Sequence, residues 1–294
     1  MLKLAAEDKK RLKGRGIILN RDQETFVARI VTVDGTLTSV QMQKLAEAAE
    51  KFGSGRVAMT IRLSVEIQGI AYENIEPMCE FLAQYGLFTG GTGARIRPVV
   101  ACKGTVCVHG LIDTQGLARE LHEAFYVGWR DVALPHKFKI GVGGCPNNCV
   151  KPSLNDFGIM GQRVPDYDSE KCRSCKKCNV EAACPMKICH VEAGSKMVRQ
   201  AEGCTNCGKC IDACPFGAVE ERAKGYRIMV GGVWGKRQRI ATDLKGIYTK
   251  DEVMQILERV LNIWREQGRP GERFGLFIDR IGFENFEAQI LEGA

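Results

Sequence analysis

The chain has 294 residues, a length that suits two domains, or two domains with an insertion, better than one. Hydrophobic residues make up 45% and charged residues 26% of it, and the mean hydropathy is -0.16, so a disordered chain is excluded and a folded globular protein is expected. The net charge is +7, but the sequence has neither a recognition helix nor a stripe of basic and aromatic residues, so we expect no nucleic-acid partner.

The first part of the chain alternates between strand and helix patterns. From β-branched content and hydrophobic periodicity we predict a strand over 25–33, a helix over 38–53, a strand over 57–63 and a helix over 73–86. A capping box from Thr38 to Gln41 marks the start of the first helix.

The same alternation continues along the chain. It predicts a strand over 97–102, a helix over 116–127, a strand over 137–144, a strand over 226–232 and a helix over 251–267. A capping box from Thr249 to Glu252 opens the last helix. A cysteine-rich segment at 165–222 therefore interrupts a larger α/β unit.

The compartment decides how the 14 cysteines are interpreted. No run approaches the roughly 18 apolar residues that a membrane helix needs, and the first residues lack the apolar core of a secretory signal. We therefore expect a cytoplasmic protein without a membrane span. Thiols stay reduced in the cytoplasm, so clustered cysteines are expected to bind metal rather than to form disulfides.

The most specific feature is an internal repeat, CRSCKKC at 172–178 and CTNCGKC at 204–210, offset by 32 residues. Each copy leads to a Cys-Pro pair, Cys184-Pro185 in the first and Cys214-Pro215 in the second. The second copy has the spacing of a bacterial two-cluster ferredoxin, and the first has two extra residues before its last cysteine. We predict an inserted bacterial-type ferredoxin domain.

In such ferredoxins the fourth ligand of each cluster comes from the other half of the domain. We assign one [4Fe-4S] cluster to Cys172, Cys175, Cys178 and Cys214, and the other to Cys204, Cys207, Cys210 and Cys184. The alternative, zinc bound by CxxC pairs, explains neither the proline nor the repetition. Cys79 and Cys189 fit no quartet and are interpreted as core thiols, with Cys189 the substitute for Cys184.

A second set of cysteines lies outside the repeat. The pairs Cys102 with Cys107 and Cys145 with Cys149 each follow a predicted strand, and strand ends are where α/β sheets place ligands. Glycines in GGCPNNC allow the backbone to approach a cofactor closely. Four such thiolates predict a third cubane, with a structural zinc site as the alternative.

Basic residues accompany this second set. Strand alternation places Lys137 and Lys139 on one face and Phe138 with Ile140 on the other. Neighbouring like charges are destabilising unless an anion lies between them. Arg97 precedes the strand that enters Cys102, and Arg29 lies on a face with Val27 and Val31. Each cation alone is typical of a solvated side chain, but together they predict an anion pocket.

These residues resemble the siroheme-dependent sulfite and nitrite reductase family, most closely the small catalytic chain of the anaerobic sulfite reductases. The resemblance covers roughly residues 25 to 290, and its most specific block is LPHKFKIGVGGCPNNC at 134–149. It implies an α+β fold with a ferredoxin-like N-terminal half over 1–94, a siroheme and [4Fe-4S] domain over 95–164 and 223–294, and the inserted two-cluster ferredoxin domain over 165–222.

The resemblance also implies roles for particular residues. Cys102, Cys107, Cys145 and Cys149 would hold a [4Fe-4S] cluster, with Cys149 bridging to siroheme iron, which makes three clusters in all. Arg29, Arg97, Lys137 and Lys139 would surround the substrate on the open face of the siroheme. Arg62 and the GGVWGK turn would anchor the carboxylates of the macrocycle, through Gly231, Gly232 and Lys236. The first cysteine pair is one residue shorter than usual, and Thr60-Ile61-Arg62-Leu63 stands where the family has Thr-Thr-Arg-Gln.

The activity implied is the six-electron reduction of sulfite to sulfide by a catalytic subunit that relays electrons through its ferredoxin clusters. Nitrite reduction to ammonium uses the same machinery and is the alternative. An interpretation from another class is a polyferredoxin-like electron-transfer subunit without an active site, which explains the repeat but neither the second cysteine set nor the cations.

Partners follow from what the sequence lacks. GGTG at 90–93 has no strand and no GxGxxG context, so no nicotinamide site is expected and electrons must come from outside. The donor would be a flavin or iron–sulfur subunit or a ferredoxin that docks near the insert. Larger relatives contain two copies of this unit, so a homodimer or a heteromeric complex is expected, with Arg29 donated across the interface.

Overall fold

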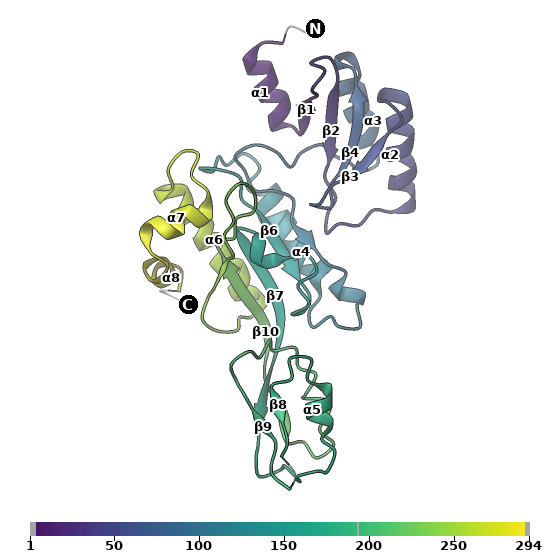
Figure 1. The fold of residues 1–294 in the computed structure, drawn as a ribbon. Helices are drawn as coiled ribbons and strands as arrows, with labels where there is room; N and C mark the ends of the chain where they lie inside the picture. Colours follow the sequence, from purple (N-terminus) through teal and green to yellow (C-terminus); the bar gives the residue numbers. More distant parts are fainter. Residues whose placement is uncertain (1–3, 193, 292–294) are drawn as a thin grey trace.

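The computed structural model describes residues 4–192 and 194–291, and its elements form three groups along the molecule (Figure 1). The N-terminal group contains α1 (Ala6–Gly14), β1 (Ile17–Leu19), β2 (Phe26–Ile30), α2 (Ser39–Phe52), β3 (Val57–Met59), β4 (Val65–Ile70) and α3 (Ile75–Ala83). Its strands form an antiparallel sheet in the order β1-β2-β4-β3. Alternate residues of β2 are buried, as the two-residue period of a half-covered strand requires.

The predicted start of α2 is confirmed. The Thr38 side chain accepts a hydrogen bond from the Gln41 backbone N–H, and the Gln41 side chain accepts one from the Thr38 N–H. The predicted strand over 57–63 is wrong at its end, because the strand stops at Met59 and residues 60–63 form a turn. Ile61 is completely exposed and Leu63 has a positive φ of 62°, so the apolar pattern here reflects a turn rather than a strand. This turn carries Arg62 toward the central group.

The central group is built on a second sheet with the strand order β11-β10-β7-β6-β5. Strands β5, β6 and β7 are parallel, and β10 and β11 are antiparallel to their neighbours. The strands are β5 (Val100–Ala101), β6 (Ile140–Gly143), β7 (Phe157–Tyr167), β10 (Val219–Val230) and β11 (Thr242–Asp243). The helices are α4 (Thr114–Leu121), a π-helical turn over His122–Val127, α6 (Lys250–Gln267), α7 (Phe274–Ile281) and α8 (Phe283–Leu291). The Thr249 capping box at the start of α6 is confirmed.

Buried aromatic rings fix the segment that enters β6. Phe138 is fully buried, and its ring centroid lies 5.5 Å from that of Trp264 and 5.1 Å from that of Phe274. The strand itself begins only at Ile140, yet the predicted alternation holds, because Phe138 and Ile140 are buried while Lys137 and Lys139 are partly exposed. The aromatic cluster therefore orients both lysines.

The cysteine-rich segment lies at the end of a two-stranded ribbon (Figure 1). β7 and β10 pair antiparallel from Phe157↔Val230 to Tyr167↔Val219, and the chain between them forms α5 (Asn179–Ala183), β8 (Cys189–His190) and β9 (Val198–Arg199). The segment is the connection at the tip of this ribbon, whose pairing is regular apart from a register shift between Glu221 and Ala223.

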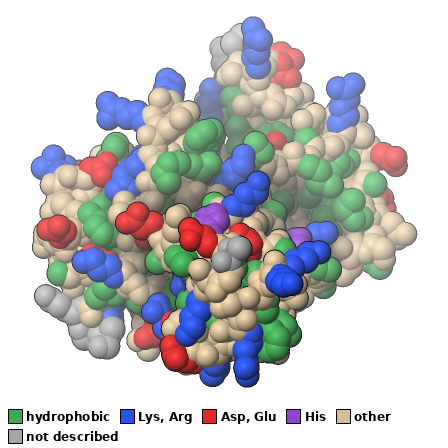
Figure 2. Space-filling model, turned by 60° about the horizontal axis from the view of Figure 1, so that its bottom comes forward, with side chains coloured by type: hydrophobic (Ala, Val, Ile, Leu, Met, Phe, Trp, Pro, Cys, Tyr) green, Lys and Arg blue, Asp and Glu red, His purple; other side chains and the backbone are tan. Residues whose placement is uncertain are grey.

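Figure 2 shows the face on which the bottom of the molecule comes forward, with Lys and Arg side chains spread over it and Asp and Glu among them. The basic excess is not gathered into one stripe on this face. Within residues 4–192 and 194–291, no helix has the length and apolar character needed to cross a bilayer.

Candidate functional site

The predicted cations come together from both halves of the molecule. Arg62 reaches from the 60–63 turn into the central group, where it donates to Asn155 Oδ1 at 2.9 Å and to the Pro98 carbonyl at 2.8 Å. Arg97 donates to the Gly91 carbonyl, and Arg29 Nη1 lies 3.5 Å from the same oxygen. Arg29 also binds Glu66 on the neighbouring strand at 2.6 Å, so part of its charge is already compensated.

The sequence motifs assign no role to two further residues of this cluster. Asp156 is fully buried, and its carboxyl group accepts from the Lys139 backbone N–H at 2.9 Å and from Arg273 at 3.1 Å. Arg273 precedes Phe274, so the aromatic cluster that orients the lysines also orients this arginine. The segment ERFG at 272–275 belongs to the family resemblance, which is the only sequence signal for Arg273.

Burial and mutual repulsion lower the pKa values of several of these cations. Burial, followed by the charges of its arginine neighbours, lowers the pKa of Arg97 to about 10, and burial lowers that of Arg62 to about 10. Burial lowers the pKa of Lys139 to about 8, with Arg62, Arg273 and Lys137 adding to the shift against the opposing effect of Asp156. The pKa of Lys137 is lowered by burial, Arg273 and Arg97.

The cluster carries more positive groups than acidic partners. Six cationic side chains share it with two carboxyl groups, those of Glu66 and Asp156; the cations are Arg29, Arg62, Arg97, Lys137, Lys139 and Arg273. Within the part of the chain that the structure describes, the buried Nε atoms of Arg62 and Arg273 and the Thr60 hydroxyl have no hydrogen-bond partner. Buried polar groups without partners are costly, so this arrangement suits a ligand that carries several negative charges.

Asp156 should be the residue on which the free cluster depends. Replacing Asp156 with Ala removes the acceptor for Arg273 and for the Lys139 N–H, so we expect a loss of about 3–5 kcal/mol of stability, as when one partner of a buried pair is deleted. Unfolding by urea, followed by circular dichroism, would measure it. Glu258→Ala on the exposed side of α6 is the control. An unchanged midpoint for Asp156→Ala would contradict this role.

The second cysteine set lies at the carboxyl edge of the central sheet. β5 and β6 are parallel neighbours, and Cys102 follows the first while Cys145 follows the second. The Gly144 N–H donates to the Cys102 sulfur at 3.1 Å, and the Leu111 N–H donates to the Gly144 carbonyl at 2.9 Å. Burial raises the pKa of Cys145, and its neighbours Cys102, Cys149 and Cys107 raise it further. The four thiols therefore share one neighbourhood.

The lysines and these cysteines lie at opposite ends of β6. Lys139 precedes Ile140, and Cys145 follows Gly143 by two residues. Four residues of strand, about 13 Å, separate the two ends. The family resemblance implies cations over a cofactor bound at these cysteines, and the separation along β6 does not favour that arrangement within one copy.

The cysteines of the insert line two cavities. Cys172, Cys175, Cys178 and Cys214 line the first, together with Tyr167 and Val219. Cys184, Cys204, Cys207 and Cys210 line the second, and Cys189 lines it as well. Each cavity thus brings together cysteines from both repeats in the combination predicted for crossed ligation. Cys189 is buried, and burial beside Cys184 raises its pKa to about 12.

Backbone amides face several of these sulfurs. The Met197 N–H donates to Cys172 and the Ala218 N–H to Cys214, each at 3.4 Å. Such N–H···S bonds stabilise cluster thiolates. Among the described residues no three His, Cys, Asp or Glu side chains meet around a single metal ion. A zinc ion would bring its thiolates to about 3.8 Å from one another, from a Zn–S bond of about 2.3 Å, whereas each cysteine sulfur of a [4Fe-4S] cluster binds a different iron.

The predicted anchors in the GGVWGK turn have different surroundings from those of the cation cluster: two pack against the protein itself and one is exposed. A Cβ on Gly231 would meet Arg239 and Ile278, and one on Gly232 would lie 2.4 Å from the Asn155 carbonyl oxygen. Both glycines are therefore needed for packing of the protein against itself. Lys236 is exposed on the hairpin that follows.

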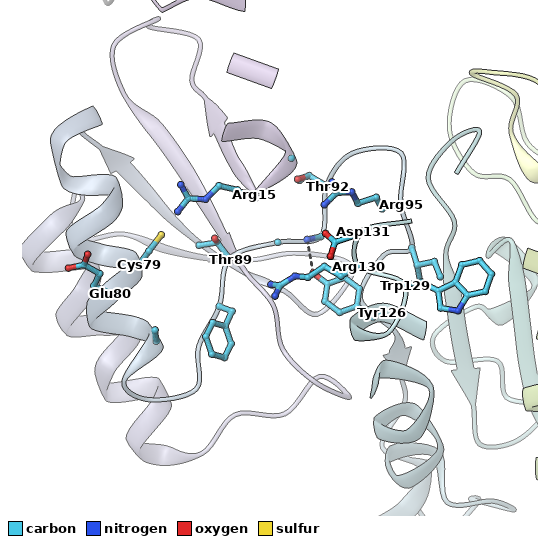
Figure 3. A pocket seen from close by; sticks show the side chains of 16 residues that line it. Arg15, Cys79, Glu80, Thr89, Thr92, Arg95, Tyr126, Trp129, Arg130 and Asp131 are labelled. Atoms are coloured by element: carbon cyan, nitrogen blue, oxygen red, sulfur yellow. Dashed lines mark hydrogen bonds between the residues drawn. The ribbon is translucent and has the colours of Figure 1, made fainter. Parts of the chain in front are cut away.

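A cavity of about 480 Å³ lies between the N-terminal and central groups (Figure 3). Arg15, Arg95, Arg130 and Cys79 line it, and the Gly91 N–H donates to the Tyr126 hydroxyl at its wall. Cys79 is half-buried there, and burial raises its pKa. None of the residues predicted for the anion pocket lines this cavity, so the sequence motifs do not identify it.

Comparison with known proteins identifies the family of this chain. Residues 92–294 match the model "Nitrite and sulphite reductase 4Fe-4S domain", and residues 18–85 match "Nitrite/Sulfite reductase ferredoxin-like half domain". The dissimilatory sulfite reductase I crystal structure has a TM-score of 0.72 at 22% identity and covers 90% of this chain and 68% of its own, which shows the shared fold.

Curated relatives are similar along nearly the whole chain. The coenzyme F420-dependent sulfite reductase of Methanocaldococcus jannaschii is 30% identical, covering 94% of this chain and 44% of its own length. An anaerobic sulfite reductase subunit of Salmonella typhimurium is 26% identical, covering 90% and 82%. The ferredoxin–nitrite reductase of Leptolyngbya laminosa is 30% identical, covering 95% and 46%. The chain thus spans less than half of two of these relatives, and it belongs to the nitrite and sulfite reductase family.

Proposed function

We propose that this chain is the catalytic subunit of a siroheme-[4Fe-4S] sulfite reductase, which reduces sulfite to sulfide. The observation that carries the proposal is the cluster of Arg29, Arg62, Arg97, Lys137, Lys139 and Arg273, in which cations outnumber carboxyl groups. Such a cluster suits both a small oxyanion and a tetrapyrrole that carries several carboxylates. The cysteine quartets support three [4Fe-4S] clusters as further cofactors.

In this proposal the arginines bind the anion and a lysine supplies a proton. Hydrogensulfite, six electrons and six protons give hydrosulfide and three waters, and the tetrapyrrole iron with its cluster would supply the redox chemistry when bound. Arg97 and Arg29 stay charged and orient the oxyanion. Lys139, whose pKa is about 8, holds a proton at Nζ that it can give up near neutral pH as S–O bonds break.

The active site would form between two copies of the chain. Within one copy the cations and the cysteines lie at opposite ends of β6, and this separation does not favour their facing one small anion. In a two-fold assembly the cation cluster of one copy can face the cysteine loops of the other, and the same contact then occurs twice. Arg29, predicted to be donated across an interface, would act there with the rest of its cluster.

Nitrite reduction is the second candidate, supported by the similarity to ferredoxin–nitrite reductase. Anaerobically purified protein should contain one tetrapyrrole and about twelve iron atoms in clusters per chain. Comparison of kcat/KM for sulfite and nitrite would then separate the two anions. Protein with clusters but no tetrapyrrole would overturn the catalytic proposal and leave an electron-transfer subunit.

A further inference from the structure

The order of the three cysteine groups along the molecule follows from the register of β7. We call Cys102, Cys107, Cys145 and Cys149 the site group, Cys184, Cys204, Cys207 and Cys210 the proximal group, and Cys172, Cys175, Cys178 and Cys214 the distal group. β6 lies beside β7 with Gly143 opposite Met160. A Cβ on Gly161 would lie 2.5 Å from the Gly144 carbonyl oxygen, so this part of β7 touches the start of the Cys145 loop.

The proximal group touches the same strand two residues further on. The Arg163 N–H donates to the Asn206 carbonyl at 2.8 Å, and Arg163 pairs with Cys207 in a parallel bridge. A Cβ on Gly208 would lie 2.6 Å from Arg163 Cδ, so the turn after Cys207 packs directly on this side chain. The Arg163 guanidinium also binds Asp212 and Glu221, which ties the loop to the ribbon. Two residues of strand amount to about 7 Å.

A cavity of about 260 Å³ marks the junction between the two groups. It is lined by Cys145 and Pro146 from the site group's loop and by Cys207 and Gly208 from the proximal group's loop, with Arg163 between them. The site and proximal groups are therefore direct neighbours.

The distal group lies further along the ribbon. Its cavity is lined by Tyr167 and Val219, which face each other at the end of the β7–β10 pairing. Tyr167 follows Arg163 by four residues, about 13 Å of strand, so the distal group is farther from Cys145 than the proximal group is.

The distal group also has an exposed basic surface. Arg173, Lys176 and Lys177 are exposed or half-exposed next to Cys175, and Phe216 beside Cys214 is 49% exposed. No ion pair joins any of these three cations to an Asp or Glu among the described residues, whereas nearby Lys171 and Lys196 are paired with acidic side chains. An unpaired basic patch with an apolar side chain at its edge suits an acidic protein partner.

We propose that an acidic one-electron donor protein docks on Arg173, Lys176 and Lys177 and delivers its electrons to the distal group. The electrons then pass to the proximal group and, across the contact at Arg163, to the site group. Each transfer oxidises one cluster by one electron and reduces the next by one. The order rests on the proposed function only in requiring the three clusters, and it can be tested without substrate or tetrapyrrole.

The order of groups is tested by electron paramagnetic resonance of the fully reduced full-length protein. Two reduced clusters that are neighbours broaden each other's signals. Cys207→Ser should abolish the broadening of the site-group signal, and Cys175→Ser should leave it, with iron analysis showing the loss of one cluster in each. Cys204→Ser and Cys172→Ser form a second pair if a variant loses more iron. Broadening that survives Cys207→Ser, or is lost in Cys175→Ser, overturns the order.

The docking surface is tested with two electron donors of opposite charge. Lys176→Glu combined with Lys177→Glu should slow reduction by a reduced plant-type ferredoxin about ten-fold at low salt, and the difference should shrink at high salt because surface charges are screened. Reduction by methyl viologen radical cation should not be slowed. Lys9→Glu combined with Lys10→Glu, on the exposed side of α1, is the control with the same change in charge. Equal slowing with both donors, or no slowing with ferredoxin, overturns the docking surface. The order of the clusters and the tetrapyrrole content are measured in separate experiments, so their outcomes do not depend on this one.

Discussion

An assembly made of one Lys139→Met copy and one Cys149→Ser copy should recover activity that neither variant has alone. If each site uses the cations of one copy and the cysteines of the other, one site of the mixed pair contains both substitutions and the other contains none. We therefore expect about half of the wild-type turnover from a mixed two-fold assembly, against nearly none from either parent. Co-expression with two different affinity tags and sequential purification would isolate the mixed species for assay.

The matched control combines Lys139→Met with Arg97→Met. Both substitutions fall in the cation cluster, so every site of this mixed assembly carries one defect and no recovery is expected. If the first pair is as inactive as its parents, the cations and cysteines of a single chain form the site, and the separation along β6 has another purpose.

Lys139→Met alone should lower turnover by about 10²–10⁴-fold, the usual contribution of a positioned proton donor. Met keeps the side chain at about the same length but removes the proton and the charge. The absorption spectrum and the iron content should stay as in the wild type, because the cysteines are untouched. Lys224→Met on β10, away from the cation cluster, is the control. Full turnover by Lys139→Met would contradict its assignment as a proton donor.

The pH dependence gives an independent measure of the same residue. Because the pKa of Lys139 is lowered to about 8, its ammonium group is charged below that pH and neutral above it. Turnover should therefore fall as the pH rises through about 8, and the residual activity of Lys139→Met should lack this limb. Lys139→Arg should also lack it, since a guanidinium keeps its proton, while restoring anion binding but not proton transfer. A profile that is flat to pH 9 in the wild type would argue against lysine as the titrating group.

Local patterns carry most of what can be predicted from the sequence. The alternation around Phe138 and the capping box at Thr38 depend on neighbours within a few residues, and the structure has both. The cysteine quartets also repeat a spacing that a short loop imposes. Asp156 and Arg273, by contrast, are 117 residues apart and meet only through the packing of α7 against the central sheet. No periodicity reports such a pair.

The roles of glycine show the same limit. The resemblance implies that Gly231 and Gly232 bind a cofactor, yet their missing side chains make room for Arg239 and for the Asn155 backbone. A glycine in a motif marks a close approach, and the sequence does not say whether a ligand or another part of the chain approaches. The predicted strand over 57–63 is too long for a related reason, because Ile61 is apolar but points to solvent in a turn.

The length of the β7–β10 ribbon determines how far the inserted domain lies from the central sheet. Shortening both strands by two facing pairs would draw that domain about 7 Å closer to the sheet and keep its orientation, whereas removing one pair would turn its opposite side toward the sheet, because side chains alternate along a strand. The number of residues in this hairpin would thus set the spacing between the proposed clusters, and its even or odd count would set which side of the inserted domain faces the sheet. A change in the length of this ribbon would therefore change the rate at which electrons from the inserted domain reach the central group.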